Sequence, residues 1–207
     1  MRTSTDSLTE DFQLTNQTPR IIIPHSMQAF PFRRMVIIGM TSAGKSTLAK
    51  RLAHQYGLDF IELDALHWEP DWHEASEEVF RRRTDEATRA ERWIADGNYY
   101  QVRDIVWGRA EAVIWLDYSF PRLFWQLTVR TFRRTIAQEE LWNGNREKFW
   151  WHLKVWSDES LYHWLFKGYW KHRHEYPQLF KELAYAHLTI IRLASPREAK
   201  AWLAGFQ

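Results

Sequence analysis

Short, mostly apolar runs alternate along the chain with longer segments in which apolar residues recur every three or four positions. Strands are predicted at 35–38, 60–63, 93–95, 112–116 and 188–193. Helices are predicted at 46–56, 76–92, 102–107, from 119 onward, and at 196–206. Apolar runs without alternation are typical of strands that are buried on both faces. Alternating strands and helices predict an α/β fold with a parallel sheet and right-handed crossovers.

The remaining segments are a polar start, a proline-containing loop and a tryptophan-rich stretch. Residues 1–20 are rich in Ser, Thr, Asn, Gln and acids, so the extension 1–33 is expected to be partly disordered. Residues 65–75 are expected to form a loop, and 138–180 to be helical or irregular. The kinase-like domain boundary is placed at residue 34, and the domain runs to residue 207.

The amino-acid composition excludes several classes of protein. Of the 207 residues, 45% are hydrophobic and 26% are charged, which is enough for a real core. The absence of Cys excludes a disulfide framework, a thiolate zinc site and a cysteine nucleophile. A net charge of +2 gives no general attraction to nucleic acid. No run is long enough to span a membrane, and residues 1–20 lack the apolar core of a secretory signal, so a cytoplasmic location is expected.

The turn after the first predicted strand carries the strongest chemical signal. Residues 39–46, Gly-Met-Thr-Ser-Ala-Gly-Lys-Ser, match the phosphate-loop pattern G-x-x-x-x-G-K-[ST], between a buried strand and a helix. Such a loop points backbone N–H groups at phosphate, while its Lys reaches the β- and γ-phosphates and its Ser can ligate Mg²⁺. The predicted nucleotide-binding residues are Gly39, Thr41, Ser42, Ala43, Gly44, Lys45, Ser46 and Thr47.

A phosphate loop that uses Mg²⁺ needs an acid on a neighbouring strand. Asp96 and Asp117 both end apolar strands, and Asp96 is preferred because the Gly97-Asn98-Tyr99 that follows lets a ligand approach the backbone. Asp117 is interpreted as a turn acid. Asp64 opens an aromatic, Pro-containing loop, in which it either holds an acceptor substrate or is a turn residue beside two core tryptophans.

Arginines follow on the long helix after the fourth strand. Arg130 shares a helix face with Arg133 and with Arg134, so the three are candidates to stabilise the transferred phosphoryl group. The alternative is a solvated basic face. No pair of His and acid residues has the spacing of a metal-binding helix, so a histidine metal site is not expected.

Taken together, these motifs resemble the adenylate-kinase-related P-loop proteins known as "topology modulation" proteins. The resemblance rests on Leu-Asp-Ala-Leu-His-Trp-Glu-Pro-Asp-Trp at 63–72, Ile-Ala-Asp-Gly-Asn-Tyr at 94–99 and Val-Ile-Trp-Leu-Asp at 113–117, besides the phosphate loop. It covers about residues 35–206. The chain departs from the group's pattern in the helix after the fourth strand, where Gln126 and Thr128 stand near an expected arginine.

The resemblance implies a three-layer nucleoside-kinase fold with helices on both faces of a five-stranded parallel sheet of order 2-3-1-4-5. It places the third strand beside the loop strand, which supports Asp96 as the metal acid. It also implies a lid, here a Trp-rich helical region at about 130–180, and an adenine site along Ala194-Ser195-Pro196.

The sequence therefore predicts a kinase that transfers phosphate from ATP, with Mg²⁺, to a small-molecule acceptor. Lys45, Asp64, Arg130, Arg133 and Arg134 are the expected catalytic residues, and Ser46 and Asp96 the expected metal ligands. The alternative is a nucleotide-dependent regulatory or nucleic-acid-binding protein, because basic and aromatic residues are interleaved at 120–187.

The Trp-rich segment is favoured as a helical core or a homodimer surface. Trp156 and Trp164 are eight apart, close to one helix face, and are expected to be packing residues. Trp150 and Trp151 are adjacent, so at least one of them is expected to be exposed.

Overall fold

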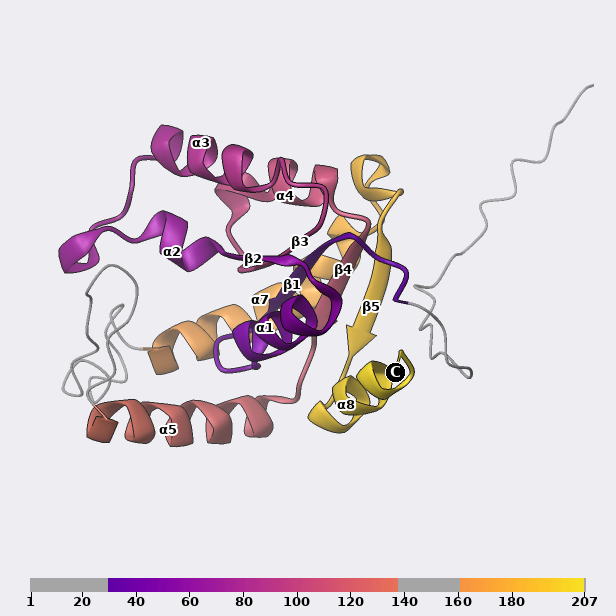
Figure 1. Ribbon diagram of the computed structural model, residues 1–207. Coiled ribbons are helices and arrows are strands. Elements are labelled where there is room, and N and C mark those ends of the chain that lie inside the picture. The colour runs from indigo at the N-terminus through magenta and orange to yellow at the C-terminus, as the bar shows by residue number, and fades with distance from the viewer. Residues whose placement is uncertain (1–29, 138–160, 207) are drawn as a thin grey trace, which may run out of the picture.

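The protein is described by a computed structural model, drawn in Figure 1. The structure describes residues 30–137 and 161–206, and for residues 134–137 the backbone alone. The predictions for 1–29 and for Trp150, Trp151 and Trp156 lie outside the described residues. No helix among the described residues is both long enough and apolar enough to cross a membrane.

Five strands and their connecting helices follow the order that the sequence predicts. The strands are β1 (Arg34–Gly39), β2 (Asp59–Glu62), β3 (Trp93–Asp96), β4 (Ala112–Leu116) and β5 (Thr189–Leu193). The helices are α1 (Lys45–Tyr56), α2 (Leu63–His67), α3 (Glu77–Ala87), α4 (Arg103–Arg109), α5 (Phe120–Ala137), α7 (Leu161–Leu179) and α8 (Pro196–Ala204). Short 3₁₀ turns lie at Pro70–Trp72, Tyr100–Val102 and Leu183–Tyr185.

All strand pairs are parallel, and the sheet order is β2-β3-β1-β4-β5. This confirms the predicted α/β fold class and the predicted order 2-3-1-4-5. The central strand β1 pairs with β3 on one side, with Ile37 opposite Asp96, and with β4 on the other. The phosphate-loop turn and Asp96 therefore lie at the same edge of the sheet, where ligands bind in this architecture.

Helices cover both faces of the sheet (Figure 1). Alternate residues of β1 supply the two cores: Met35 and Ile37 face α1, α5 and α8, whereas Val36 and Ile38 face α3 and α4. This period of two is the geometry of a strand that is buried on both sides. It explains why the strand reads as an unbroken apolar run.

Helix α7 belongs to both layers. Its first half buries Leu165 and Tyr169 in the core with α1, α5 and α8, and its last turns bury Tyr176 in the core with α3 and α4. Tyr176 packs edge-on against Trp115 of β4, with ring centroids 5.7 Å apart. The helix therefore spans the layers, and one side of it contacts the phosphate loop, as described below.

Three segments differ from the sequence interpretation or extend it. Residues 63–67, where the end of the second strand and the start of a loop are expected, form the short helix α2. Trp164 is 55% exposed, so the prediction that it is a buried packing residue is wrong. At the start of the described chain, the Phe30 ring stacks on Tyr56 at 4.0 Å and packs edge-on against Phe206 of the C-terminal end.

Asp117 ties β4 to β5 and α7. Its carboxylate lies 2.7 Å from the Arg173 Nε and accepts a hydrogen bond of 2.8 Å from the Arg192 Nε. Its side chain is buried, whereas both arginines are partly exposed. Asp117 is therefore a structural ion-pair partner rather than a turn acid alone, and both of its oxygens are engaged.

We expect Asp117→Asn to lower the free energy of unfolding by about 2 kcal/mol, because an amide turns one donor toward two guanidinium groups and removes a charge-assisted bond. In a chain of this size that corresponds to about 4–8 °C in the melting temperature. Asp104→Asn breaks an exposed ion pair with Arg81 and should lower the stability by under about 1 kcal/mol. Equal thermal shifts for the two variants would contradict the structural role of Asp117.

Candidate functional site

The phosphate loop leaves β1 at Gly39 and enters α1 at Gly44. Gly39 has φ +148° and Gly44 has φ +90°, conformations that L-residues with a side chain rarely adopt. A Cβ on Gly39 would lie 2.7 Å from the carbonyl oxygen of Leu116. The first glycine is therefore required by the close approach of β4, and the second by the left-handed turn that starts the helix.

Asn98 holds the start of this loop. Its Oδ1 accepts a hydrogen bond from the Gly39 N–H at 3.1 Å, and its Nδ2 donates to the Gly39 carbonyl at 2.6 Å. Sequence reasoning singled out Asn98 only as part of a stretch that a ligand can approach. The clamp depends on two segments 59 residues apart, and no local pattern reveals such a contact.

Lys45, Ser46 and Asp96 come together at the end of β1 and β3. Burial lowers the pKa of Lys45. The positive charge of Arg130 lowers this pKa further, whereas the negative charges of Asp64 and Asp96 raise it. Burial raises the pKa of Asp96 to about 6, against a hydrogen bond from Ser46 and the charge of Lys45. The predicted phosphate lysine and both predicted metal ligands thus occupy one site.

The donor set fits a magnesium ion that shares its shell with phosphate and water. Asp96 is buried, and its Oδ1 has no hydrogen-bond partner in the described structure. The Ser46 side chain is hydrogen-bonded to the Asp96 carboxyl group. One carboxylate and one hydroxyl beside a phosphate loop are the protein ligands that Mg²⁺ uses in nucleotide sites, where it keeps most of its waters.

Asp64 lies beside this cluster at the start of α2. The hydroxyl of Tyr99 donates a 2.5 Å hydrogen bond to its Oδ1. The Tyr99 ring is held between His67 and Phe80, at centroid distances of 4.6 and 5.0 Å. Asp64 therefore has a fixed orientation. Tyr99 is a positioning residue that the sequence analysis quoted only within the Asp-Gly-Asn-Tyr string.

The two tryptophans of the loop after Asp64 are half-buried rather than core plugs. Trp68 and Trp72 pack edge to face, with centroids 5.6 Å apart. Trp72 and its neighbour Asp71 both have positive φ, near +58°, which is strained for residues with side chains.

The structure separates the three candidate arginines. Arg130 of α5 donates a 3.1 Å hydrogen bond to the Thr41 hydroxyl, so it reaches the phosphate loop. Arg133 is exposed, and no bond places it at the site. The side chain of Arg134 lies outside the described residues. The predicted nucleotide residues Ser42, Ala43 and Thr47 stand within or directly after the loop; Ala43 is buried and Thr47 is exposed.

Helix α7 contacts the loop through Met40. The Met40 Cε lies 3.0 Å from where a Cβ of Gly168 would stand, and its sulfur lies 3.2 Å from Nδ1 of His172. Burial lowers the pKa of His172 to about 4, and Lys171, Lys45 and Arg103 lower it further against Glu175. A neutral imidazole is therefore packed on the phosphate loop, a feature that the sequence analysis missed.

A concave region lies between the start of α5 and the loop that leads into α8. An open groove of about 370 Å³ is lined by Ser119, Arg122, Ala194, Ser195, Pro196 and Arg197. Ser195 caps α8 by accepting from the Glu198 N–H, which fixes the loop after β5. The groove contains the Ala194-Ser195-Pro196 loop that the family resemblance assigns to adenine.

Comparison with known proteins gives a partial match to shikimate kinases. The sequence model of the family "Shikimate kinase" matches residues 41–95. A shikimate kinase of Parabacteroides distasonis is 40% identical over 57 residues, which is 28% of this chain and 32% of that protein. The chain thus matches about a third of the length of the curated relative. The family model runs from the phosphate loop into β3.

Solved structures share the fold over most of the chain. A shikimate kinase from Bacteroides thetaiotaomicron superposes with a TM-score of 0.51 at 16% identity and covers 84% of this chain and 96% of its own. A gluconokinase from Sinorhizobium meliloti gives a TM-score of 0.49 at 18% identity, covering 86% and 93%. At 16% identity, the likeness to the shikimate kinase structure shows the fold alone.

The pKa of His172 predicts how stability responds to acid. In the unfolded chain His172 binds a proton near pH 6.5, whereas in the fold it does so only near pH 4. The unfolded state therefore binds more protons between these values, and the protein loses stability as pH falls through this window. Between pH 7 and pH 5 the loss from this group is about 2 kcal/mol.

We expect His172→Gln to remove this part of the acid sensitivity, since Gln keeps a polar group near Met40 but does not titrate. Urea unfolding of both proteins at pH 7 and pH 5 measures it. The gap in unfolding free energy between the two pH values should be smaller in the variant. An unchanged gap would show that folding leaves the pKa of His172 close to its value in the unfolded chain.

Proposed function

We propose that this protein is a kinase that transfers the γ-phosphoryl group of ATP, with Mg²⁺, to a hydroxyl group of a small-molecule acceptor. The observation that carries the proposal is the convergence of Lys45, Ser46 and Asp96 at the end of β1 and β3, with Asp64 beside them. A site that only binds nucleotide has no need of a second, oriented carboxylate next to the metal acid. The partial match to shikimate kinase agrees with this reaction class.

Each residue has a task in the transfer. Lys45 neutralises charge on the β- and γ-phosphate oxygens, and Arg130, already bonded to Thr41, stabilises the transferred group. Asp64, held by Tyr99, orients the acceptor hydroxyl and takes its proton. The hydroxyl oxygen forms a bond to the γ-phosphorus, the bond from that phosphorus to the bridging oxygen breaks, and ADP leaves.

Ser46 and Asp96 would hold Mg²⁺, which would supply neutralisation of the phosphate charge. Arg133 and Arg134, from the last turns of α5, are assigned to the same phosphates when nucleotide binds. The groove between Arg122 and the loop before α8 is the candidate adenine site, because a guanidinium and a flat loop can sandwich a base.

Several finer assignments go with this proposal. Asp64 and Tyr99, which share a hydrogen bond, belong to the two strings that resemble the "topology modulation" proteins, and we propose membership of that group on this basis. The domain division at residue 34, a lid at about 130–180 and a cytoplasmic location stay predictions. So does a homodimer through the Trp-rich segment.

The alternative function, a nucleotide-dependent regulator that binds nucleic acid, is favoured by the outer surface of α5. This helix has four arginines and no acid, and its exposed aromatic residues include Trp125 and Phe132, 64% and 63% exposed. Basic groups beside exposed rings suit single strands. Salt-dependent binding of a single-stranded oligonucleotide, lost in Trp125→Ala, would support the regulator; its absence leaves the kinase.

We expect Lys45→Ala to lower turnover at least about a hundredfold and to weaken ATP binding, because a charge stabiliser is removed. Lys50→Ala, on the exposed side of the same helix, is the matched control and should retain activity. ATP consumption against monophosphates, nucleosides and hydroxylated metabolites measures turnover, and calorimetry measures binding. A folded Lys45→Ala protein with unchanged ATP affinity would overturn the nucleotide site.

Asp96→Asn should lower turnover and raise the Mg²⁺ concentration needed for half-maximal rate, because a charged ligand becomes neutral at the same size. Asp117→Asn should change the Mg²⁺ requirement much less, since both of its oxygens serve the ion pairs with Arg173 and Arg192. Magnesium titrations at saturating ATP compare the two. The reverse ranking would show that Asp117 is the metal acid.

A further inference from the structure

Most of the exposed apolar side chains in the described part of the chain belong to two neighbouring helices, α5 and α7. Nine large hydrophobic side chains are exposed there, four of them on α5 and three on α7. The two helices pack against each other, and Figure 1 shows α5 at the periphery of the molecule. Single exposed apolar residues are normal, whereas a cluster of them marks an interaction site. None of these seven side chains has a task in the proposed phosphoryl transfer.

Aromatic rings join the two helices at their seam. The centroid of the Phe120 ring lies 4.9 Å from that of Phe166 and 6.3 Å from that of Phe124. Tyr162 of α7 donates a 3.1 Å hydrogen bond to the Thr128 hydroxyl of α5. Phe124 and Phe166 are 41% and 50% exposed, so each helix presents an aromatic ring to the outside along this seam.

On α5 the exposed apolar residues continue outward from the seam. At about 100° per residue, Trp125, Val129 and Phe132 fall within an arc of about 60°. Phe124 lies on the side of this arc that faces α7. Arg133, which is exposed, borders the arc on the side away from α7.

Helix α7 shows the same order in mirror image. Phe166 faces the seam, and Trp170, four residues later and 69% exposed, lies next to it on the outer side. Lys167 is exposed and borders Trp170 on the side away from α5. Trp164 lies beyond this lysine, about 120° from Trp170, and is not part of the cluster. We call the cluster the α5–α7 surface; it comprises Phe124, Trp125, Val129, Phe132, Phe166 and Trp170.

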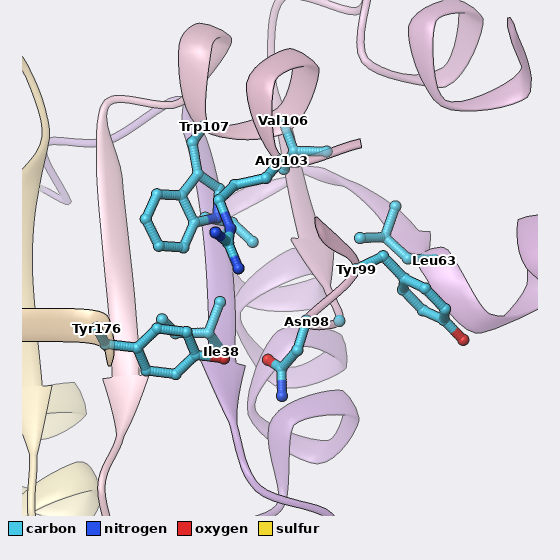
Figure 2. A pocket seen from close by; sticks show the side chains of 10 residues that line it. Ile38, Leu63, Asn98, Tyr99, Arg103, Val106, Trp107 and Tyr176 are labelled. Atoms are coloured by element: carbon cyan, nitrogen blue, oxygen red, sulfur yellow. The ribbon is translucent and has the colours of Figure 1, made fainter. Parts of the chain in front are cut away.

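The inner side of α7 is closed to a partner. Tyr176 is buried there beside a cavity of only about 10 Å³, drawn in Figure 2, which has room for about one water molecule. The single acid of α7, Glu175, lies 3.6 Å from a guanidinium nitrogen of Arg103, which lines the same cavity. Helix α5 has no acid. The outer side of the two helices therefore combines apolar rings with basic residues alone.

We propose that the α5–α7 surface binds the surface of an anionic lipid bilayer. Tryptophan and phenylalanine side chains insert at the level of the lipid head groups, and basic side chains beside them bind the lipid phosphates. An apolar centre between the basic edges at Arg133 and Lys167 matches this arrangement in shape and charge. The inference goes beyond the proposed kinase function and does not depend on it.

Two other occupants fit the surface less well. A second copy of the chain would place basic edges against basic edges. A nucleic-acid single strand, the partner in the alternative function above, needs free ring faces for its bases. Phe124 and Phe166 are packed at the seam, and Val129 has no ring. The surface thus offers continuous apolar area rather than a row of stacking platforms.

Co-sedimentation with vesicles tests the proposal, using the full chain without nucleotide. Vesicles of phosphatidylcholine alone are compared with vesicles in which about one third of the lipid is phosphatidylglycerol. We expect binding to the anionic vesicles to be at least about tenfold tighter, because basic residues face the head groups. Equal binding to both kinds of vesicle, or no binding to either, would overturn the proposal.

Substitutions within the surface should weaken binding to the anionic vesicles. We expect a loss of about tenfold for Trp125→Ala and for Trp170→Ala, one on each helix, because each removes an apolar side chain from the lipid. Trp125→Phe keeps a ring and should retain most of the affinity. Lys167→Gln should weaken binding about fivefold through the lost charge. Lys167 is chosen because the arginines of α5 are also assigned to the nucleotide.

Matched control variants lie outside the surface. Tyr100→Ala removes an aromatic ring that is 74% exposed in the turn before α4, and Arg82→Gln removes an exposed charge of α3. Both should bind the anionic vesicles as the unmodified protein does. Equal losses in Tyr100→Ala and Trp125→Ala would contradict the assignment to this surface. If Trp125→Ala does not fold, Trp170→Ala makes the same comparison.

Two further measurements identify the other occupants. Binding of a single-stranded oligonucleotide that is lost in Trp125→Ala, without binding to anionic vesicles, would assign the surface to nucleic acid and overturn the proposal. Light scattering that gives twice the mass of one chain, and half of that in Trp125→Ala, without vesicle binding, would assign it to a second copy. A monomer that binds anionic vesicles and not the oligonucleotide supports the lipid surface.

Discussion

The arrangement of the site depends on how closely the two neighbours of β1 approach its last residue, Gly39. Gly39 ends β1 where a side chain would strike the Leu116 carbonyl of β4, and its N–H and carbonyl are both bonded to Asn98 after β3. The phosphate loop is thereby fixed against both neighbours of its own strand. Lys45 and Ser46, the first residues of α1, therefore lie close to Asp96.

The opposite charges of Lys45 and Asp96 do not fully offset the cost of their burial. Asp96 is buried and Lys45 is partly buried, and burial shifts both pKa values toward the neutral forms despite their mutual attraction. A buried carboxyl group with one unpaired oxygen destabilises the protein when it is charged, unless a cation joins it. Asp117, the other strand-end acid, has two arginines instead. Asp96 therefore has an oxygen that is open to a ligand, whereas both oxygens of Asp117 stabilise the fold.

Helix α7 connects the site to both cores. Leu165 and Tyr169 pack on one side of the sheet and Tyr176 on the other, so the helix cannot shift without disturbing both layers. The same helix places His172 on the phosphate loop, Arg173 on Asp117 and the Tyr176 hydroxyl beside Arg103. A segment that sequence patterning described only as helical and Trp-rich thus contributes a contact with the phosphate loop and an ion-pair partner for Asp117.

Local sequence was enough for the strands and for the phosphate-loop motif, and Asp96 as the metal acid stays a prediction. Unbroken apolar runs mark buried strands, the glycine and lysine spacing marks the phosphate loop, and Asp96 ends the strand that carries Gly97-Asn98-Tyr99; family resemblance supplied the strand order. Tertiary structure alone decided the rest. Three hydrogen bonds, Asn98 to Gly39, Tyr99 to Asp64 and Arg130 to Thr41, join residues 35 to 89 positions apart. The spacing of apolar residues indicates which side of a helix or strand is buried. It does not indicate which side chains of a distant element will contact that side.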